Sequence, residues 1–487
     1  MPSSIFSNSS YENFRVFYDG QIISGGNLME RVAATAGSLA SSGLHRNDIA
    51  GILSDNSLEF VIAVLALWQI GAVPMPISTR LTDNEISKVL SSVSCSVLLT
   101  DSQNGSRSIL NKIRSFTFAD LTYEKAKRVM EMSDRSYDET ALVILTSGST
   151  ATPKGVRLTF KNLVYSALAS DQFFNHKKDD KWLASLPFYH IGGFSVITRS
   201  LLFGTELIIP SDLSQDAILY SIGEYHPSFA SFVPTQLKRI LEKGGTSHQS
   251  LRKILLGGGF IDSNLVRSAI EAGWPVAKSY GSSETASFIT VLPPENFNNK
   301  PESAGKPLEG NKIFIVDEKE KLLAANEPGE IAVESPAVAG GYINDELLTL
   351  SRFRKGIYYT GDYGYMDGDG YLYVLARKDE FIISGGEKIN PREVEIAILN
   401  HPQVEDAAVL ALNDSEWGQI VAAVVVPRGQ AEVTISDLRR FLKNRLASYK
   451  HPKKLFTVSS IPRTPLGKVK LGELQEIVRE INNSSPF

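Results

Sequence analysis

The sequence contains a single cysteine, Cys95, among 487 residues. One cysteine excludes an internal disulfide, a cysteine-rich zinc site and a C-x-x-C redox pair. The seven histidines are scattered along the chain, so no local histidine motif for a metal is present. Any metal ion is therefore expected to bind through oxygen ligands.

A strong excess of one charge is also absent. The 50 basic and 54 acidic residues give a formal net charge of −4. This balance lacks the basic footprint of a nucleic-acid-binding protein, so no nucleic-acid partner is expected.

Long uninterrupted apolar runs are missing as well. The longest, at 60–77, contains Gln69, Gly71, Pro74 and Pro76, so it cannot supply the ~20 apolar residues of a membrane-spanning helix. We expect a buried helix followed by a strand there, and no membrane insertion. The first residues carry no basic segment followed by an apolar core, so we predict no secretory signal and a cytoplasmic location.

The pattern along the chain predicts an α/β fold class. At ~150 residues per domain, the length suggests roughly two to four structural units. Helical spacing alternates with short apolar strands up to about residue 300, which favours parallel-type sheets covered by helices. Short strands divided by Gly, Pro and Asp turns then indicate a small β-barrel-like unit at about 301–376. We therefore predict a large N-terminal domain at 1–376 and a smaller α+β C-terminal domain at 377–487.

The individual elements are predicted from apolar periodicity. Helices are expected at 27–43, 57–70, 86–91, 159–170, 235–243, 391–400 and 435–446, followed by a tail. Strands are expected at 49–53, 72–77, 96–100, 141–145, 181–185, 205–209, 251–256, 313–316, 329–333, 357–360, 371–375, 380–384, 404–412 and 419–426.

The segment 141–155, ALVILTSGSTATPKG, has the composition of a phosphate-binding loop. An apolar strand leads into hydroxyl side chains and a glycine, and a lysine supplies a positive charge, as a polyphosphate requires. It is not a Walker A loop, because Pro153 and Gly155 flank the lysine. A solvated flexible loop is the plain alternative, but the preceding strand and the Pro-Lys-Gly end favour phosphate. The predicted phosphate-binding residues are Thr146, Ser147, Gly148, Ser149, Thr150 and Lys154.

Further motifs follow in a fixed order. Each alone could be a turn, a helix cap, an interdomain linker or a surface lysine. They are a glycine triplet at 257–259, SYGSSET at 279–285, YTGDY at 359–363, ARKDEFIISGGEKINP at 376–391 and IPRTPLGK at 461–468.

Together these motifs resemble the acyl-adenylate-forming superfamily, which includes acyl-CoA synthetases, aryl-CoA ligases, luciferases and peptide-synthetase adenylation domains. The resemblance extends over nearly the whole chain. The sequence departs from the usual pattern at Ala151 and Ala376, where glycine is typical, and at Ser283, where the family has threonine.

The resemblance implies a nucleotide site. Tyr280 would stack on adenine, Ser283 would donate to the α-phosphate, and Asp362 would bind the ribose hydroxyls. Arg377 would contact ribose or phosphate. Glu284 would hold Mg²⁺ with Thr146, since Mg²⁺ usually takes one or two protein ligands beside phosphates and water. Gly257, Gly258, Gly259, Ser279 and Gly281 complete the implied ATP/AMP-binding set.

The resemblance also implies a two-step reaction with ATP, Mg²⁺ and coenzyme A. A carboxylate would attack the α-phosphorus of ATP, and the thiol of coenzyme A would then attack the acyl-adenylate. Lys154 would hold the β- and γ-phosphates, and Lys468 would bridge the carboxylate and α-phosphate. The C-terminal domain would rotate about a hinge at Asp379 between the steps. Ser384, Gly385 and Gly386 would then line the path of coenzyme A.

The acid pocket is expected to include His190, Arg199, Thr235, Gly258 and Ser282. His190, in LPFYHIGG, would act as a gate; a hydrogen-bonded core histidine is the alternative. Arg199 follows an apolar stretch of a predicted helix, where a cation would suit an anionic substrate group. An exposed helix arginine is the other interpretation.

Within the superfamily, four segments are most similar to the o-succinylbenzoate–CoA ligase family of menaquinone synthesis. They are LLGGG at 255–259, SYGSSET, WGQ at 417–419 and LASYKHPK at 446–453. The substrate of that family has two carboxylates. Our hypothesis is therefore that Arg199 pairs with the aromatic carboxylate while the succinyl carboxylate is activated.

Three alternatives stay open. One is another aryl- or fatty-acyl-CoA ligase, and one is a stand-alone adenylation enzyme that loads a carrier protein. The third, a nucleotide-binding regulatory protein without catalysis, is disfavoured because the implied catalytic residues are all present. The expected partners are a small carboxylic acid, ATP and coenzyme A, and a homodimer is left open.

Overall fold

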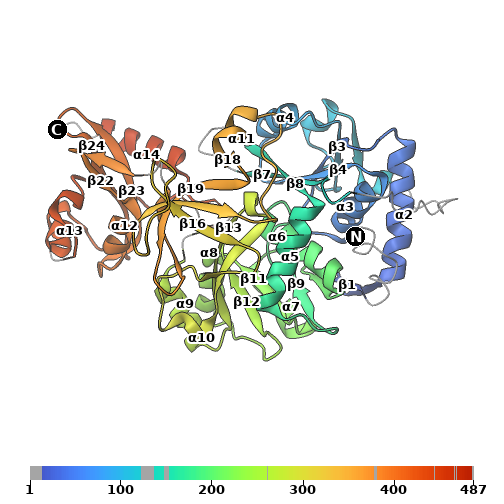
Figure 1. Ribbon diagram of the computed structural model, residues 1–487, viewed down its shortest axis with the longest axis horizontal. Coiled ribbons are helices and arrows are strands. Elements are labelled where there is room, and N and C mark those ends of the chain that lie inside the picture. Colours follow the sequence, from blue (N-terminus) through green and yellow to red (C-terminus); the bar gives the residue numbers. More distant parts are fainter. Residues whose placement is uncertain are drawn as a thin grey trace. The chain divides into compact units, whose positions relative to one another are not determined.

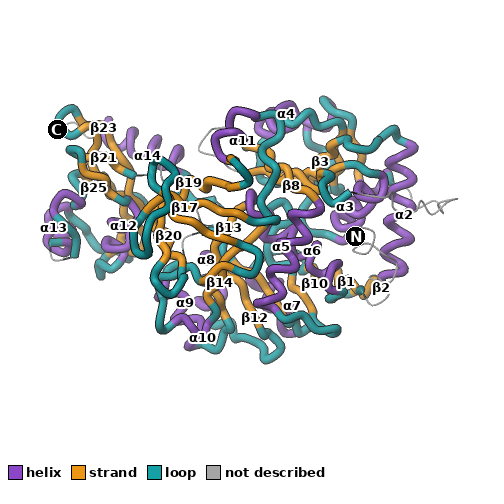
Figure 2. The backbone as a smooth tube through the Cα atoms, viewed as in Figure 1, coloured by secondary structure: helices purple, strands orange, loops and turns teal. Residues whose placement is uncertain are grey.

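Figures 1 and 2 show the computed structural model of the chain. The structure describes residues 14–121, 136–146, 153–259, 261–377, 381–443, 445–464, 467 and 469–484. It divides into two compact units: Met1–Ile313 with Val333–Tyr359, and Phe314–Ala332 with Thr360–Phe487. The predicted boundary at 376/377 stays a prediction, and its hinge residue Asp379 lies outside the described residues.

A nine-stranded sheet dominates the first unit (Figure 2). Its order is β15-β14-β13-β12-β11-β9-β10-β1-β2. The strands from β13 to β1 pair in parallel, as predicted, whereas β14, β15 and β2 pair antiparallel at the two edges. The strands are β1 Arg15–Tyr18, β2 Gln21–Ser24, β9 Lys181–Leu183, β10 Glu206–Ile209, β11 Phe229–Phe232, β12 Lys253–Leu256, β13 Val276–Ser282, β14 Ser287–Leu292 and β15 Lys306–Pro307.

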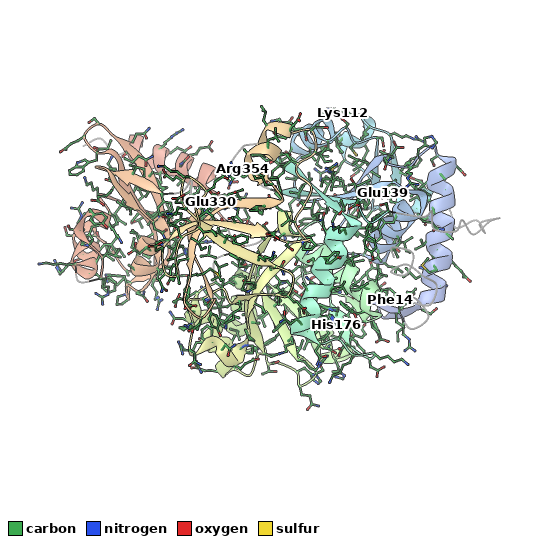
Figure 3. All side chains as sticks on the ribbon, viewed as in Figure 1. Phe14, Lys112, Glu139, His176, Glu330 and Arg354 are labelled. Atoms are coloured by element: carbon green, nitrogen blue, oxygen red, sulfur yellow. The ribbon has the colours of Figure 1, made fainter. Side chains whose placement is uncertain are left out.

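Helices cover this sheet, and Figure 1 shows α5 and α6 side by side. The Thr159 side chain accepts a hydrogen bond from the Asn162 backbone N–H and so caps α5. His176, labelled in Figure 3, follows α5 and stacks on Phe203 with ring centroids 4.1 Å apart. The helices are α5 Phe160–Phe174, α6 Ile191–Phe203, α7 Gln215–Tyr225, α8 Pro234–Glu242, α9 Ser263–Glu271 and α10 Pro294–Phe297.

A second, four-stranded sheet of the first unit is entirely parallel, in the order β4-β3-β5-β6. Helix α3 is buried along nearly all its length, as expected for this apolar segment. Within the described residues, no helix is both long and apolar enough to cross a membrane. The elements are α2 Gly25–Ser41, β3 Ile49–Leu53, α3 Leu58–Ile70, β4 Val73–Ile77, α4 Asp83–Ser92, β5 Val97–Thr100 and β6 Ser115–Thr117.

The predicted β-rich region forms a five-stranded sheet in the order β16-β17-β19-β18, with β20 also paired to β19. Here Gly361 donates its backbone N–H to Glu330, which is labelled in Figure 3. A short helix, α11 Glu346–Arg352, precedes β18. The strands are β16 Lys312–Val316, β17 Gly329–Glu334, β18 Phe353–Arg354, β19 Ile357–Met366 and β20 Leu372–Arg377.

The C-terminal residues form another five-stranded sheet, in the order β22-β21-β24-β23, with β25 beside β24. Alternate residues of β24 serve two cores: Val421, Ala423 and Val425 enter one, Ala422 and Val424 the other. The tail predicted after residue 446 contains, among its described residues, a 3-10 helix at Ser448–Lys450, strand β25 and helix α14. The elements are β21 Ile382–Ser384, β22 Glu387–Ile389, α12 Pro391–Leu399, β23 Val404–Asp414, β24 Gly418–Pro427, α13 Ile435–Leu442, β25 Lys454–Thr457 and α14 Leu471–Ser484.

Candidate active site

Thr146 and Lys154 face each other across an antiparallel pair of strands, β7 Thr140–Thr146 and β8 Lys154–Thr159. Directly opposite residues of such a pair place their side chains on the same face. The hydroxyl of Thr146 also donates to the backbone oxygen of Lys154, at 3.5 Å. The structure therefore brings together the first and last residues of the predicted phosphate loop. The loop residues Ser147, Gly148, Ser149 and Thr150 lie outside the described residues.

Glu284 is linked to the same strand pair through the segment 339–343. The phenol of Tyr342 donates to Glu284 Oε1 at 2.9 Å, and the Ala339 N–H donates to the Glu284 backbone oxygen at 2.7 Å. The segment itself pairs with β8: Ile343 N–H donates to Gly155 O at 2.8 Å, and Tyr342 bridges Val156. Lys154 and Glu284 thus belong to one hydrogen-bonded framework.

The side-chain oxygen atoms of Thr146 and Glu284 are of the kind that Mg²⁺ binds. Glu284 uses Oε1 for Tyr342, and no hydrogen bond to its other carboxylate oxygen is found among the described residues. Within the same part of the chain, no cluster of three or more His, Cys, Asp or Glu side chains could hold a metal. A metal here would therefore take one or two ligands from the protein and the rest from phosphate and water, which suits Mg²⁺.

The motif SYGSSET spans the end of β13 and a single 3-10 turn at Ser283–Thr285. Tyr280 and Gly281 lie at a register shift in the β13–β14 pair. A side chain at position 281 would place its Cβ 2.1 Å from the Ser287 backbone oxygen, so only glycine fits. This close approach turns the chain into the segment that carries Ser283 and Glu284.

The glycine triplet follows β12 directly, as predicted. Ser279 donates its hydroxyl to Leu256 O at 2.9 Å, and Gly257 N–H donates to Phe232 O at 3.1 Å. These bonds join the ends of β11, β12 and β13. Gly258 has a φ of 82° and Gly259 is part of the same turn. The triplet and Ser279 therefore lie together.

His190 occupies the N-cap position of α6, at the end of the loop that follows β9. Its ring packs edge-on against Tyr189 at 4.8 Å. The Asn56 side chain holds this loop: it donates to Ala184 O and Leu186 O and accepts from Phe188 N–H, at 3.3, 2.9 and 2.8 Å. Sequence reasoning missed Asn56, because nothing in the sequence links it to a loop so far along the chain.

Thr235 lies in the first turn of α8. Its neighbour Gln236 donates to Ser185 O at 3.0 Å, which ties α8 to the loop that carries His190. Strands β9, β11, β12 and β13 are parallel, so the segments that follow them meet at one edge of the sheet. The carboxyl edge of an open α/β sheet is where ligands usually bind. The predicted residues gathered there are His190, Thr235, Gly257, Gly258, Gly259, Ser279, Tyr280, Gly281, Ser282, Ser283 and Glu284.

Arg199 is buried, with only 1% of its surface exposed, so the alternative of an exposed helix arginine is wrong. Its Nε donates to Ser170 Oγ and its Nη2 to Ser287 Oγ, both at 3.1 Å. Helical spacing predicted on which side of the helix Arg199 lies. It could not show that α5 and β14 pack against that side.

The surroundings of Arg199 are aromatic. The guanidinium carbon lies 5.1 to 5.8 Å from the ring centroids of Phe174, Trp182 and Phe288. Burial lowers the pKa of Arg199 to about 9, so the side chain stays mainly cationic at neutral pH. Within the described part of the chain, Nη1 has no hydrogen-bond partner and no carboxylate pairs with the guanidinium. A buried cation in this state favours an anionic partner.

Two predicted nucleotide residues are paired in the second unit. Asp362 of β19 is the register partner of Arg377 of β20, and Arg377 Nε lies 2.9 Å from Asp362 Oδ1. The Asp362 N–H donates to Thr360 Oγ1, which in turn donates to Ile331 O. The Asp362 carboxylate is therefore held in place, next to a half-exposed arginine.

The predicted coenzyme A segment is the turn between β21 and β22. Ser384 pairs with Glu387, and the two residues between them, Gly385 and Gly386, have φ angles of 59° and 87°. A type I′ turn requires positive φ angles at both central residues, and glycine adopts them readily. The Gly385 N–H donates to the backbone oxygen of Trp417 at 2.9 Å. Lys468 and Asp379 lie outside the described residues.

The chain is similar to known proteins over most of its length. Residues 7–343 match the family described as AMP-binding enzyme, and residues 393–468 match the AMP-binding enzyme C-terminal domain. A 2-succinylbenzoate–CoA ligase of Bacillus cereus (strain Q1) is 35% identical over 93% of both chains.

Solved structures of o-succinylbenzoate CoA synthetase from Bacillus subtilis share the fold. One, in complex with the acyl-adenylate intermediate OSB-AMP, has a TM-score of 0.91 at 34% identity and covers 97% of each chain. Another, in complex with ATP and a magnesium ion, has a TM-score of 0.88 at 34% identity, covering 97% of this chain and 98% of that one. By sequence over most of its length, and by fold, the chain belongs to the AMP-binding enzyme family.

Proposed function

We propose that the chain is an ATP-dependent, AMP-forming acid–CoA ligase whose acid substrate is 2-succinylbenzoate, in menaquinone synthesis. The chain spans 93% of the Bacillus cereus ligase and 97% of the Bacillus subtilis synthetase in complex with OSB-AMP. The proposal therefore concerns the whole enzyme. Its substrates are the acid, ATP and coenzyme A, and its metal is Mg²⁺.

In the first step, a carboxylate oxygen of the acid attacks the α-phosphorus of ATP, and pyrophosphate leaves. Thr146 on β7 and Lys154 on β8, which lie opposite each other, hold the phosphates. Glu284 and Thr146 hold Mg²⁺, which neutralises phosphate charge when bound. Tyr280 stacks on adenine and Ser283 donates to the α-phosphate. These residues act by placing charge and donors, which is the main requirement of phosphoryl chemistry.

In the second step, the thiol of coenzyme A attacks the acyl carbon, and AMP leaves with its bonding electron pair. No protein nucleophile takes part. The single cysteine, Cys95, is not suited to act as a nucleophile. Burial raises the pKa of Cys95 to about 11, so its thiol stays protonated at neutral pH. Ser384, Gly385 and Gly386 line the coenzyme A path, and His190 gates the site.

The choice of acid rests on one structural observation, the buried and unmatched cation Arg199. Its Nη1 lacks a hydrogen-bond partner among the described residues, and so does the Oγ of Ser282. Ser287 binds Arg199 and is the register partner of Ser282. On this proposal, Arg199 donates hydrogen bonds to the aromatic carboxylate of 2-succinylbenzoate, while the succinyl carboxylate is activated.

The remaining roles stay predictions from the family resemblance. Asp362 binds ribose, Arg377 contacts ribose or phosphate, and Lys468 bridges the carboxylate and the α-phosphate. Asp379 acts as the hinge of a mobile C-terminal domain. A cytoplasmic location and a homodimer are predictions of the same kind.

Product analysis tests the proposal and separates it from its rivals. The purified protein is incubated with ATP, Mg²⁺, 2-succinylbenzoate and free coenzyme A, and the products are identified by mass. We expect AMP and 2-succinylbenzoyl-CoA in equal amounts. Formation of the adenylate without the thioester would favour an enzyme that loads a carrier protein. Absence of AMP with this and every other acid would overturn the proposal.

A further inference from the structure

One short segment, 339–343, forms hydrogen bonds with both the side chain and the backbone of Glu284. Tyr342 Oη donates to Glu284 Oε1 at 2.9 Å, and the Ala339 N–H donates to the Glu284 backbone oxygen at 2.7 Å. A hydrogen bond from a phenol to a carboxylate is charge-assisted and thus stronger than a neutral one. The orientation of this carboxylate is therefore set from outside its own turn.

The segment is itself fixed on several sides. Its backbone pairs with β8 through Gly155 and Arg157. The Tyr342 N–H donates to Thr349 Oγ1 at 2.9 Å, and the phenol ring packs edge-on against Phe353 at 5.6 Å. Since both the backbone and the ring are held, the phenol oxygen has a defined position before any ligand binds.

We propose that Tyr342 is a positioning residue for the metal. It occupies Oε1 of Glu284 and so reserves the other carboxylate oxygen, Oε2, for the Mg²⁺ that accompanies ATP. The proposal rests on the proposed function, in which Glu284 is a Mg²⁺ ligand. Mg²⁺ demands near-ideal octahedral geometry, which a carboxylate bound through one oxygen satisfies better than a chelating one.

The same segment joins the metal ligand to the phosphate-binding strand. Ile343 N–H bonds to Gly155 O, next to Lys154, while Tyr342 bonds to Glu284. Lys154 and Glu284 are thus positioned by neighbouring residues of one rigid support. Tyr342 sets the affinity for the metal and leaves metal-independent nucleotide binding unchanged.

The test uses the full-length protein and a non-cleavable ATP analogue with a methylene group between the α- and β-phosphates. Binding of the analogue is measured by equilibrium dialysis, first with a chelator and then along a Mg²⁺ titration. Partners that orient metal ligands typically contribute about 10- to 100-fold in metal affinity. We expect Tyr342→Phe to raise the half-saturating Mg²⁺ concentration about tenfold or more, with analogue binding in chelator unchanged.

Tyr373→Phe is the matched control. It also removes one phenol–carboxylate bond, Tyr373 Oη to Asp367 Oδ2 at 3.3 Å, from a different sheet. We expect it to titrate like the wild type. Glu284→Gln supplies a second comparison: adding Tyr342→Phe to it should change the Mg²⁺ titration no further, because the two residues act through one ligand.

Each result is decisive. If the wild-type protein binds the analogue equally well with and without Mg²⁺, the assigned metal site is wrong and the proposed function loses its support. If the wild type depends on Mg²⁺ but Tyr342→Phe titrates identically, Tyr342 is not a positioning residue. Loss of analogue binding in chelator as well, or a further effect in the Glu284→Gln background, would show a general structural role and overturn the inference.

Discussion

Arg199 on α6 and Ser287 at the start of β14 are joined by a 3.1 Å hydrogen bond from Nη2 to Oγ. Ser287 lies opposite Ser282, which is the last residue of β13. The bond thus connects the fully buried guanidinium to the strand end that leads into Glu284. Among the described residues, Nη1 of the same guanidinium has no hydrogen-bond partner.

Replacing Arg199 by methionine should weaken binding of the acid specifically. Methionine retains much of the apolar bulk inside the aromatic surroundings but removes the charge. Because a hydrogen bond to a charged group contributes about 1.5–3 kcal/mol, we expect the KM for 2-succinylbenzoate to rise roughly 10- to 100-fold. The KM for ATP should change little. Steady-state kinetics with each substrate varied in turn measures both values.

The control is Arg267→Met, on the exposed side of α9, whose guanidinium lies near Phe297. It should leave both KM values unchanged. The melting temperature of each variant is recorded, so that a folding defect is recognised. An unaltered KM for the acid in a folded Arg199→Met protein would remove Arg199 from the substrate site.

Gly281→Ala should destabilise the protein. The added Cβ would lie 2.1 Å from the Ser287 backbone oxygen, and neighbouring backbone cannot move away without breaking the β13–β14 pair. Forced contacts of this type usually cost about 1–3 kcal/mol. Denaturant titration of the free energy of unfolding provides the measurement.

Gly37→Ala is the matched control for Gly281→Ala. Gly37 lies inside α2, and an added Cβ there meets no atom within 4 Å. Alanine is favoured over glycine in a helix interior by roughly 0.5–1 kcal/mol, so this variant should be more stable than the wild type. Equal effects of the two substitutions would contradict the close approach at Gly281.

Acid should destabilise the fold through His176. Only 3% of its side chain is exposed, and burial lowers the pKa of His176 below its ordinary 6.5, although the nearby Asp171 carboxylate opposes this shift. The unfolded chain therefore binds the proton more readily than the folded one. The contribution of neutral His176 to the free energy of unfolding is therefore complete above pH 6.5 and is lost as the pH falls below that value.

The measurement compares unfolding free energies at about pH 7.5 and about pH 5.5, on either side of the ordinary histidine pKa. His176→Gln keeps an oxygen that can accept the hydrogen bond from Trp182 Nε1, at 3.2 Å in the wild type, but cannot titrate. We expect the variant to lose less stability on acidification than the wild type. His226→Gln, at an exposed position, should behave like the wild type; an identical loss in all three proteins would refute the assignment.

The sequence was sufficient to predict several of the strands and helices that carry a single apolar pattern. Strands β1, β11 and β13 of the large sheet and helices α7 and α9 were not predicted. The run at 141–145 is uniformly apolar, and it forms β7 almost as predicted. Its partner β8 was not predicted, because Lys154 and Arg157 interrupt the apolar pattern. In the same way, α14 and the antiparallel edges of the large sheet depend on tertiary packing that local patterns do not encode.

The candidate site, too, could be predicted from the sequence only in part. Motif order located Thr146, Lys154 and Glu284, and the structure places the first two opposite each other. Tyr342 escaped notice because it is 58 residues from Glu284 and carries no local signal of its own. Only the pairing of the 339–343 segment with β8 brings the phenol to the carboxylate.

We expect this ligase to recognise an acid with two carboxylates, one activated and one held by Arg199. The most direct measurement is ATP–pyrophosphate exchange with 2-succinylbenzoate and with 3-benzoylpropanoate, which lacks only the aromatic carboxylate. Loss of one charge-assisted contact corresponds to about 1.5–3 kcal/mol. We therefore expect kcat/KM to be roughly 10- to 100-fold lower for 3-benzoylpropanoate than for 2-succinylbenzoate. In Arg199→Met this difference should nearly disappear. Equal exchange with both acids in the wild-type protein, or stronger exchange with a benzoate or a fatty acid, would show that the aromatic carboxylate is not recognised.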